Sequence, residues 1–260
     1  MEIGLRGKRA LVTGGDSGIG EAIVLALAAA GADVAINHVD TTGAAQQVVQ
    51  QVQAAGARGI EVFADVSDAG EVERMFAALD AAWGGIDILI NNAGIDGPHA
   101  LAWEADPAAW QRVLQVNLFG AFHCARAALQ RMVHARSGVV CNVTSVHELI
   151  PWAGYSAYTA SKAGLSMLTK TLAQEAAPHG VRVVALAPGA IQTPINRAVW
   201  SDPHGLRDLL RKIPLRRMGT TDEIARMAVV LVSDAASYLT GATVFVDGGM
   251  TLYPSFQHGG

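Results

Sequence analysis

Cysteine is scarce in this chain, and long apolar runs are missing. The two cysteines among 260 residues, Cys124 and Cys141, form no CxxC pair and stand near no histidine at metal-ligand spacing. They indicate buried, reduced thiols rather than a disulfide framework or a metal site, which favours a cytoplasmic location. Residues 1–8 are polar and lack the apolar core of a signal peptide. No apolar run reaches the ~18 residues of a membrane helix, so we expect no membrane partner.

Charge is also low, at 16% of the residues, and the net charge is −4. Nucleic-acid binding calls for a basic stripe, so this balance argues against a nucleic-acid partner. Apolar residues reach 51%, which is enough for a core on both faces of a sheet. Because no repeat, charge run or Gly/Ser linker divides the chain, we expect a single domain over residues 1–260.

Short runs rich in Val and Ile alternate with longer helical patterns. The expected strands cover residues 9–13, 33–37, 59–63, 86–90, 138–143, 181–186 and 242–246. The expected helices cover residues 19–30, 42–55, 69–83, 110–135, 156–177 and 221–233. Continuous apolar strands separated by amphipathic helices predict an α/β fold, a Rossmann-like doubly wound parallel sheet with helices on both faces.

Residues 192–219 break this alternation. The segment holds three prolines, one tryptophan and scattered arginines. Connections this long are typical of binding loops, so we expect a substrate-loop insertion here. An ordinary surface insertion is the alternative.

A glycine cluster, TGGDSGIG, runs from Thr13 to Gly20 between the first strand and the first helix. Its spacing is GxxxGxG rather than the GxGxxG fingerprint of dinucleotide-binding proteins. Glycines allow a tight turn and close approach of a phosphate, and the helix N-terminus offers free N–H groups to an anion. The cluster therefore predicts a phosphate site.

Tyr158 and Lys162 are four residues apart on a predicted helix, so their side chains share one face. A tyrosine with an ordinary pKa of about 10 acts as a base near neutral pH only if that pKa falls by roughly three units. A nearby cation lowers it by favouring the phenolate. In isolation such a pair is more often a solvated surface pair, but here it follows a strand that ends at Ser145.

Seven motifs occur in one order along the chain. They are TGGDSGIG (Thr13–Gly20), Asp65-Val66, NNAG (Asn91–Gly94), Asn117, Ser145, YTASK (Tyr158–Lys162), and Pro188-Gly189 with Thr193. In these motifs the sequence resembles the short-chain dehydrogenase/reductase family over essentially its whole length. The resemblance implies an NAD(P)-dependent oxidoreductase with a Rossmann-like fold.

The resemblance implies a catalytic group of Asn117, Ser145, Tyr158 and Lys162. Tyr158 is then the acid/base, and Ser145 positions the reacting oxygen. Lys162 also holds the nicotinamide ribose, and Asn117 helps to hold a water that relays the proton outward. Taken alone, Asn117 is more typical of a local backbone contact.

The resemblance also implies cofactor contacts along the carboxyl ends of the strands. They involve Gly14, Asp16, Ser17, Gly18, Ile19, Gly20, His38, Asp65, Val66, Asn91, Ala93, Gly94, Tyr158, Lys162, Pro188, Gly189, Ile191 and Thr193. Asp65 is expected to accept from the adenine amino group. On its own it is also a candidate helix N-cap, a role open to Ser67 and Asp68 as well.

The choice between NAD and NADP depends on the residues after the second strand. An acidic residue there binds the ribose 2′-hydroxyl of NAD, and this chain has His38 in that place. Val39 stands where glucose dehydrogenases that accept NADP tend to carry arginine, and Asp16 would repel a 2′-phosphate. NAD is therefore favoured over NADP.

Three segments are similar to those of bacterial glucose 1-dehydrogenases, a subgroup of the family: SVHELIPW at 145–152, PGAIQTPIN at 188–196 and DGGMTLYPSFQ at 247–257. This similarity implies hydride transfer from the C1 hydroxyl of an aldose, which gives a lactone. The expected contacts to a sugar or alcohol substrate are Asp96, Ser145, His147, Trp152 and Asn196. For His147 and Trp152, loop packing is an equal alternative.

Two other functions compete. A carbonyl reductase such as a 3-oxoacyl-carrier-protein reductase would need a basic docking patch, for which the candidates are Arg207, Arg211, Lys212, Arg216 and Arg217. A nucleotide-binding sensor without catalysis is the non-enzyme alternative, and the intact Ser145, Tyr158 and Lys162 argue against it. The resemblance implies a homotetramer formed through the two long helices. The apolar tail, residues 251–257, is expected to dock on a partner subunit.

Overall fold

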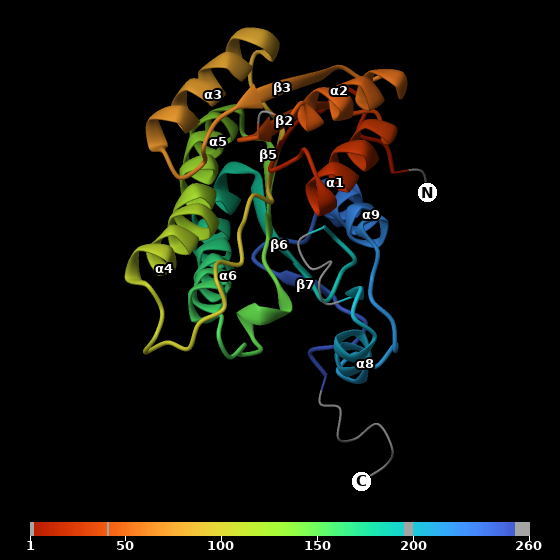
Figure 1. Ribbon diagram of the computed structural model, residues 1–260. Coiled ribbons are helices and arrows are strands. Elements are labelled where there is room, and N and C mark those ends of the chain that lie inside the picture. The colour runs from red at the N-terminus through yellow and green to blue at the C-terminus, as the bar shows by residue number, and fades with distance from the viewer. Residues whose placement is uncertain (1–2, 41, 195–199, 253–260) are drawn as a thin grey trace.

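A parallel sheet forms the centre of the molecule (Figure 1). The computed structural model describes residues 3–40, 42–194 and 200–252. Within them the sheet has seven strands in the order β3-β2-β1-β4-β5-β6-β7. The strands are β1 (Arg9–Thr13), β2 (Asp33–His38), β3 (Gly59–Phe63), β4 (Ile88–Asn91), β5 (Gly138–Val143), β6 (Val181–Pro188) and β7 (Thr243–Val246). This confirms the predicted Rossmann-like fold.

Helices cover both faces of the sheet (Figure 1). One face carries α1 (Gly18–Ala29), α2 (Ala44–Ala54) and α9 (Thr221–Val232), and the other carries α3 (Ala69–Trp83), α5 (Ala121–Ala135) and α6 (Ser156–Ala176). The remaining described helices are α4 (Pro107–Leu114), α8 (Pro203–Arg211), a π-helical segment η1 (Gln115–Gly120) and three short 3₁₀ helices, η2 (Val146–Glu148), η3 (Ala177–His179) and η4 (Asp234–Ala236).

Alternating strand residues build a core on each face of the sheet. Val12 and Ile36 pack in the cluster with α1 and α9, whereas Leu11, Ala35 and Leu89 pack in the cluster with α3 and α5. All five of these residues are fully buried, with 0% of their surface exposed. Burying an aliphatic side chain of the size of valine or leucine stabilises a fold by about 1.5–3 kcal/mol, so the strands are held firmly and their carboxyl ends have fixed positions.

The chain reverses its direction of travel across the sheet between β1 and β4. From β1 it moves outward to β2 and β3, and it then returns to β4 and continues to β7. Such a switch point opens a crevice at the carboxyl ends of the strands, where ligands of doubly wound folds bind. The glycine turn after β1 and the NNAG segment after β4 both lie at this edge.

Two predicted elements differ from the structure. The single helix expected over 110–135 begins earlier, at Pro107, with Asp106 as its N-cap, and it is interrupted by η1 before α5. The loop expected over 192–219 contains the helix α8, which Asp202 caps. The Asp-Pro pair at its start is an N-cap followed by proline at the first helical position, and this signal could have revealed the helix.

Candidate active site

The glycine turn after β1 is shaped to receive a bound group. Gly14 and Gly18 have φ angles of 58° and 57°, which disfavour any side chain. A Cβ at Gly20 would collide with the carbonyl oxygen of Gly14. Ser17 is the N-cap of α1 but makes no side-chain cap hydrogen bond, so it leaves the N–H groups of the first turn for another acceptor. These features fit a pyrophosphate at the helix N-terminus.

Hydrogen bonds join this turn to the segment after β4. The Thr13 hydroxyl accepts from the backbone N–H groups of Asn92 and Ala93, at 2.9 and 3.0 Å. The Asn92 amide donates to the carbonyl oxygens of Thr13 and Gly14, at 3.0 and 2.9 Å. Asn92 thus holds the two segments that flank the crevice, a role that was not predicted from the sequence.

The Asn91 side chain turns away from the crevice. Its amide nitrogen donates to the carbonyl oxygen of Ala121 at 3.0 Å and to Oδ1 of Asn142 at 2.9 Å. The residue is buried, at 4% exposed. Of Asn91, only the backbone can therefore line the adenosine ribose as expected. Ala93 and Gly94 follow it along the edge of the crevice.

Asp65 at the end of the β3 segment is bound by protein groups. One oxygen accepts from the N–H and the hydroxyl of Ser67, and the other pairs with Arg112 of α4 at 2.8 Å. Partial burial alone would raise the pKa of Asp65, but these hydrogen bonds outweigh it and lower that pKa. The N-cap of α3 is Asp68, whose carboxylate accepts from the N–H of Glu71. Arg112 was not predicted from the sequence.

Val66 is buried, and its side chain packs against Gly120 of the π-helical segment. A Cβ at Gly120 would come within 2.6 Å of the Val66 side chain. His38 is likewise held by neighbours at the end of β2. Its Nδ1 lies 2.7 Å from the carbonyl oxygen of Asp40, and its Nε2 lies 3.7 Å from the carboxylate of Glu61. Val39, next to it, is 60% exposed. An apolar side chain, a histidine ring and one carboxylate thus lie at the place where a ribose 2′-substituent is expected.

The helix α6 and the end of β5 bring three predicted catalytic residues together. The Lys162 ammonium lies 5.6 Å from the centre of the Tyr158 ring and donates to the carbonyl oxygen of Val143 at 2.9 Å. Ser145 forms a side-chain hydrogen bond with Tyr158. The Ser145 hydroxyl also accepts from the N–H of His147 at 3.2 Å, so it sits at the start of η2.

Asn117 projects from η1 and connects the crevice edge to α6. Its oxygen accepts from the N–H of Ile95 at 2.8 Å, and its nitrogen donates to the Ile95 carbonyl and to the Ser161 hydroxyl. A Cβ on Gly94 would lie 3.3 Å from the Asn117 oxygen and 3.6 Å from the Lys162 nitrogen. Asn117 is therefore close to Lys162 and also makes the local backbone contact that its sequence position allows. Single π-helical turns often occur at functional sites.

Burial shapes the protonation of this group. The Tyr158 side chain borders the crevice, yet desolvation raises its pKa to about 12, and its hydrogen bond with Ser145 opposes the rise. Lys162 is 5% exposed, and desolvation lowers its pKa to about 8, whereas the charges of Asp96 and Glu148 raise it. At pH 7 the lysine is thus mainly a cation and the tyrosine a neutral phenol.

An aromatic stack forms one wall beside Tyr158. The Trp152 ring stacks on His147, with centroids 4.5 Å apart, and on Tyr155, with centroids 4.0 Å apart. Both Trp152 and His147 also meet Tyr158 edge to face, at 6.1 and 6.2 Å. The structure therefore brings Trp152 and His147 to the catalytic group. Asn196, the other predicted substrate residue from the later loop, lies outside the described residues.

Two ionisable groups, Asp96 and His147, lie at this wall and act on one another. Asp96 is half-buried, and desolvation raises the pKa of its carboxyl group while Lys162 and His147 lower it. Desolvation lowers the pKa of His147, whose Nδ1 lies 3.0 Å from the carbonyl oxygen of Ile150. Because a carbonyl only accepts, Nδ1 carries the proton, and Nε2 of the neutral ring is left as an acceptor.

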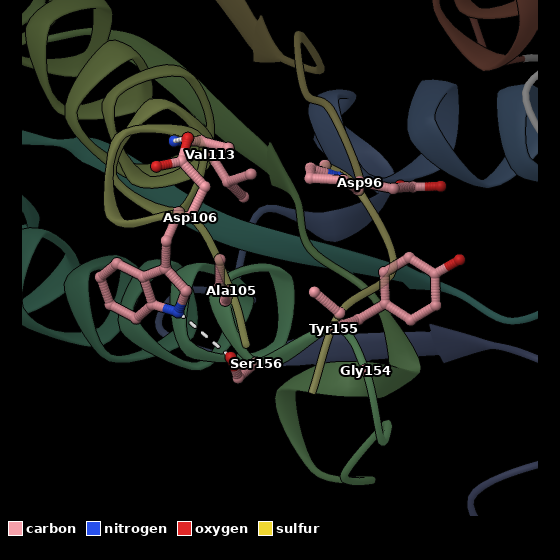
Figure 2. A pocket seen from close by; sticks show the side chains of 13 residues that line it. Asp96, Ala105, Asp106, Val113, Gly154, Tyr155 and Ser156 are labelled. Carbon is pink, nitrogen blue, oxygen red and sulfur yellow. Dashed lines mark hydrogen bonds between the residues drawn. The ribbon is translucent and has the colours of Figure 1, made fainter. Parts of the chain in front are cut away.

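A small cavity adjoins the site between α4, the start of α6 and the segment after β4 (Figure 2). Asp96 and Tyr155 both line it, and the Trp110 indole donates to the Ser156 hydroxyl at 3.1 Å along its wall. Its volume of about 20 Å³ is enough for one water molecule but not for a substrate. The cavity is thus a water-sized recess behind Asp96.

The end of β6 forms the opposite side of the crevice. A Cβ on Gly189, which follows Pro188, would come within 2.7 Å of the Asp247 Cα. Ile191 is buried and bridges to Gly219. Thr193 approaches the glycine turn, because a Cβ on Gly18 would lie 3.9 Å from its side chain. The residues expected around the nicotinamide and the pyrophosphate thus meet across the crevice.

The described part of the chain shows no helix long and apolar enough to cross a membrane. Within the same residues, no three His, Cys, Asp or Glu side chains gather as a metal site would require.

A doubly wound sheet, a glycine turn suited to a pyrophosphate and a serine–tyrosine–lysine group at the crevice define a nucleotide-dependent oxidoreductase. Comparison with known proteins agrees. The family model described as enoyl-(acyl carrier protein) reductase matches residues 14–251. The chain belongs to the short-chain dehydrogenase/reductase family, whose members use NAD(P).

Several relatives have different named activities. The chain is 44% identical to 3beta-hydroxysteroid dehydrogenase 1 of Eggerthella lenta, over 98% of each chain. It is 41% identical to glucose 1-dehydrogenase 2 of Bacillus subtilis, over 96% of this chain and 97% of the relative. Among solved structures, a gluconate 5-dehydrogenase of Burkholderia cenocepacia in complex with NADP and tartrate superposes with a TM-score of 0.92 at 34% identity, over 97% of this chain and 98% of that one.

Proposed function

We propose that this oxidoreductase transfers a hydride from the C1 hydroxyl of an aldose to a nicotinamide cofactor and releases a lactone. The observation that carries the chemistry is the contact between the Lys162 ammonium and the Tyr158 ring beside Ser145. The observation that supports a sugar is the wall formed by Trp152 and His147 next to that group.

The proposed mechanism assigns one task to each residue. Ser145 donates to the substrate oxygen and fixes its position, and Tyr158 accepts the hydroxyl proton. When bound, the cofactor supplies the hydride acceptor. Lys162 favours the phenolate form of Tyr158, because a neighbouring cation lowers the pKa of an acid. Asn117 orders the segment around Ile95 and holds the water that carries the proton away.

The cofactor would lie along the switch-point crevice. We assign the pyrophosphate to the glycine turn, which comprises Gly14, Asp16, Ser17, Gly18, Ile19 and Gly20. The adenosine is assigned to His38, Asp65, Val66, Asn91, Ala93 and Gly94, and the nicotinamide end to Tyr158, Lys162, Pro188, Gly189, Ile191 and Thr193. If Asp65 accepts a hydrogen bond from adenine, its carboxylate must do so while it keeps its ion pair with Arg112.

We also propose that NAD is the better cofactor. A 2′-phosphate needs a cation, whereas the end of β2 presents the exposed Val39 and the pair of His38 with Glu61. Asp16 in the glycine turn adds negative charge on the other side. The relative solved with NADP indicates that the fold accommodates either cofactor, so the choice depends on these few side chains.

The stacked rings suit a sugar for physical reasons. A pyranose offers C–H groups that pack on an aromatic face and hydroxyls that need partners. The stack supplies the aromatic surface, in which Trp152 is 39% exposed, and Asp96 and Nε2 of His147 supply acceptors. The 41% identity to a glucose 1-dehydrogenase supports the same substrate class.

A hydroxysteroid is the second candidate, because the chain shares 44% identity with a 3beta-hydroxysteroid dehydrogenase. Leu101, Trp103 and Leu149 are 37%, 81% and 65% exposed on the two segments that border the site, and they could pack on a fused apolar ring system. A carrier-protein substrate has weaker support, because in the proposed basic patch Arg211 pairs with Asp208 and Arg217 pairs with Glu223.

A homotetramer is part of the proposal. Phe122 on α5 and Met167 on α6 are 42% and 60% exposed, as expected of helices that pack against a second subunit. The apolar tail beyond residue 252 lies outside the described residues, so its docking on a partner stays a prediction. Deleting residues 251–260 should weaken assembly or activity, which a sizing column and a turnover assay would show.

The test of the substrate is an assay of reduced-nicotinamide formation with aldoses, 3β-hydroxysteroids and simple secondary alcohols, each run with NAD and with NADP. Aldose oxidation that is more efficient with NAD is the expected result. Turnover of the steroid alone would replace the aldose by the second candidate. No turnover of any alcohol with either cofactor would overturn the proposed function.

A further inference from the structure

Glu148 is an acidic residue close to the catalytic group for which the proposed mechanism has no use. It ends η2, which begins directly after Ser145, and its N–H donates to the Ser145 carbonyl at 3.0 Å. One carboxylate oxygen accepts from the Ser166 hydroxyl at 2.8 Å. The other is buried and has no hydrogen-bond partner among the described residues.

The carboxylate of Glu148 lies on the same side of α6 as Lys162. Ser166, to which it is bound, follows Lys162 by four residues, and residues at this spacing are neighbours on one helix face. Both Lys162 and Ser166 are buried, at 5% and 6% exposed. Charges in such surroundings act on one another more strongly than at a surface, because little water screens them.

Two further groups act on Lys162 from other directions, and a third acts on one of these two. Asp96 reaches it from the segment after β4, Tyr158 from its own helix, and His147 faces Asp96 from η2. Asp96 borders the crevice, and the same burial that affects Lys162 raises the pKa of Asp96. Asp96 also lines the water-sized cavity, whereas Glu148 is held by its hydrogen bond with Ser166.

We infer that Glu148 is a positioning residue that keeps Lys162 in its ammonium form beside the Tyr158 phenol. This inference rests on the proposed function. Burial pulls the lysine toward its neutral form, and a neutral amine would not favour the phenolate. A fixed buried carboxylate one helical turn away opposes that loss, whatever the state of Asp96.

A titration of the cofactor-free protein tests the inference without any substrate. The chain has only four lysines, at positions 8, 162, 170 and 212, so NMR of protein with labelled lysine side chains can follow Lys162 by itself. Glu148→Gln should lower the pKa of Lys162 below about 8, because an anionic neighbour is removed. Ser166→Ala is the matched control, since it removes the hydrogen bond and keeps the charge.

Kinetics give the second measurement. In Glu148→Gln the fall of kcat at alkaline pH should begin at a lower pH than in the wild type, with a loss of up to about tenfold for each unit by which the lysine pKa falls. Glu148→Asp should restore most of the wild-type profile. If glutamine prevents folding, Glu148→Ala replaces it with the same expectation.

An unchanged Lys162 titration in Glu148→Gln, or an equal change in Ser166→Ala, would overturn the inference. Absence of alcohol oxidation by the wild type would instead remove the proposed function, while the effect on the lysine titration would stand on its own. The two failures are therefore distinguishable.

Discussion

The two sides of the crevice are built from different parts of the chain. On the β1 side, the proposed cofactor site consists of backbone groups: the glycine turn, the N–H groups at the start of α1 and the carbonyl oxygens held by Asn92. Beyond β5, side chains form it, with Trp152, His147 and Tyr155 stacked beside Tyr158. A backbone site suits a ligand shared by many enzymes, whereas a side-chain wall can change its ligand with few substitutions.

The same difference is consistent with the different named activities of the relatives. Proteins named as steroid, glucose and acyl-carrier-protein enzymes match nearly the whole chain at 38–44% identity. The features they have in common with this chain include the fold, which fixes where a nucleotide binds. We therefore expect the substrate of this chain to be selected by side chains of the segments that follow β4 and β5 and of residues 192–219.

Removing the Tyr158 hydroxyl should have the most severe consequence, because both sides of the crevice meet at this group. Tyr158→Phe should lower kcat roughly a thousandfold by removing the acid/base. Calorimetry should find the binding of NAD retained, because the glycine turn is unaltered. Tyr155→Phe is the matched control, since this phenol belongs to the same aromatic stack, and it should keep most of the turnover. Equal losses in the two variants would contradict the assignment.

A methyl group in the glycine turn should damage the β1 side selectively. Gly20→Ala places a Cβ against the Gly14 carbonyl and the Asn92 amide, so it should weaken NAD binding about a hundredfold and destabilise the fold by about 1–3 kcal/mol. Gly4→Ala is the control, because nothing lies within 4 Å of its Cβ position. Calorimetry and thermal unfolding measure both effects. Unchanged NAD binding in Gly20→Ala would remove the phosphate assignment.

Truncating the aromatic wall should affect the substrate alone. Trp152→Ala should raise the KM of an aldose about tenfold, a loss of about 1.4 kcal/mol, and leave the dissociation constant of NAD unchanged. Trp103→Ala changes a more exposed tryptophan, at 81%, and should leave the KM of the aldose nearly unchanged. Steady-state kinetics with both variants would decide. A weaker affinity for NAD in Trp152→Ala would show that the two sides are not separable.

A substitution of Val39 should have the smallest effect, on the preference between NAD and NADP, because this side chain is exposed. Val39→Arg introduces a cation where a 2′-phosphate is expected, and an exposed ion pair is worth up to about 1 kcal/mol. The ratio of kcat/KM for NADP to that for NAD should therefore rise about fivefold. Val39→Gln, which is long but neutral, is the control. An equal rise with glutamine would mean that charge is not the cause.

Local patterns were enough to predict most of the fold. The predicted bounds of β1, β3, α3 and β5 agree with the structure, because each is a short apolar run or a capped amphipathic helix whose signals lie within it. The π-helical turn that carries Asn117 was not predicted. An inserted residue in a helix leaves the apolar periodicity on both sides intact, so nothing local marks it.

Family motifs name the candidate site residues, but they do not reveal the distant partners that these residues contact in the fold. The pair of Asp65 with Arg112 joins residues 47 positions apart, and the inward turn of Asn91 depends on Asn142, 51 positions away. Only the packed sheet brings such residues together. The stacking of Trp152 on His147 and Tyr155 also depends on how the segment after β5 folds back on itself.

The central claim is that Tyr158 becomes a base in the working enzyme although burial raises its pKa to about 12 in the cofactor-free protein. The most direct measurement is the pH dependence of kcat for alcohol oxidation by the wild type at saturating cofactor. The account predicts a rate that rises with pH through a midpoint well below the ordinary tyrosine pKa of about 10 and then falls at alkaline pH, as Lys162 loses its proton. A rate that keeps climbing past that pH would contradict it.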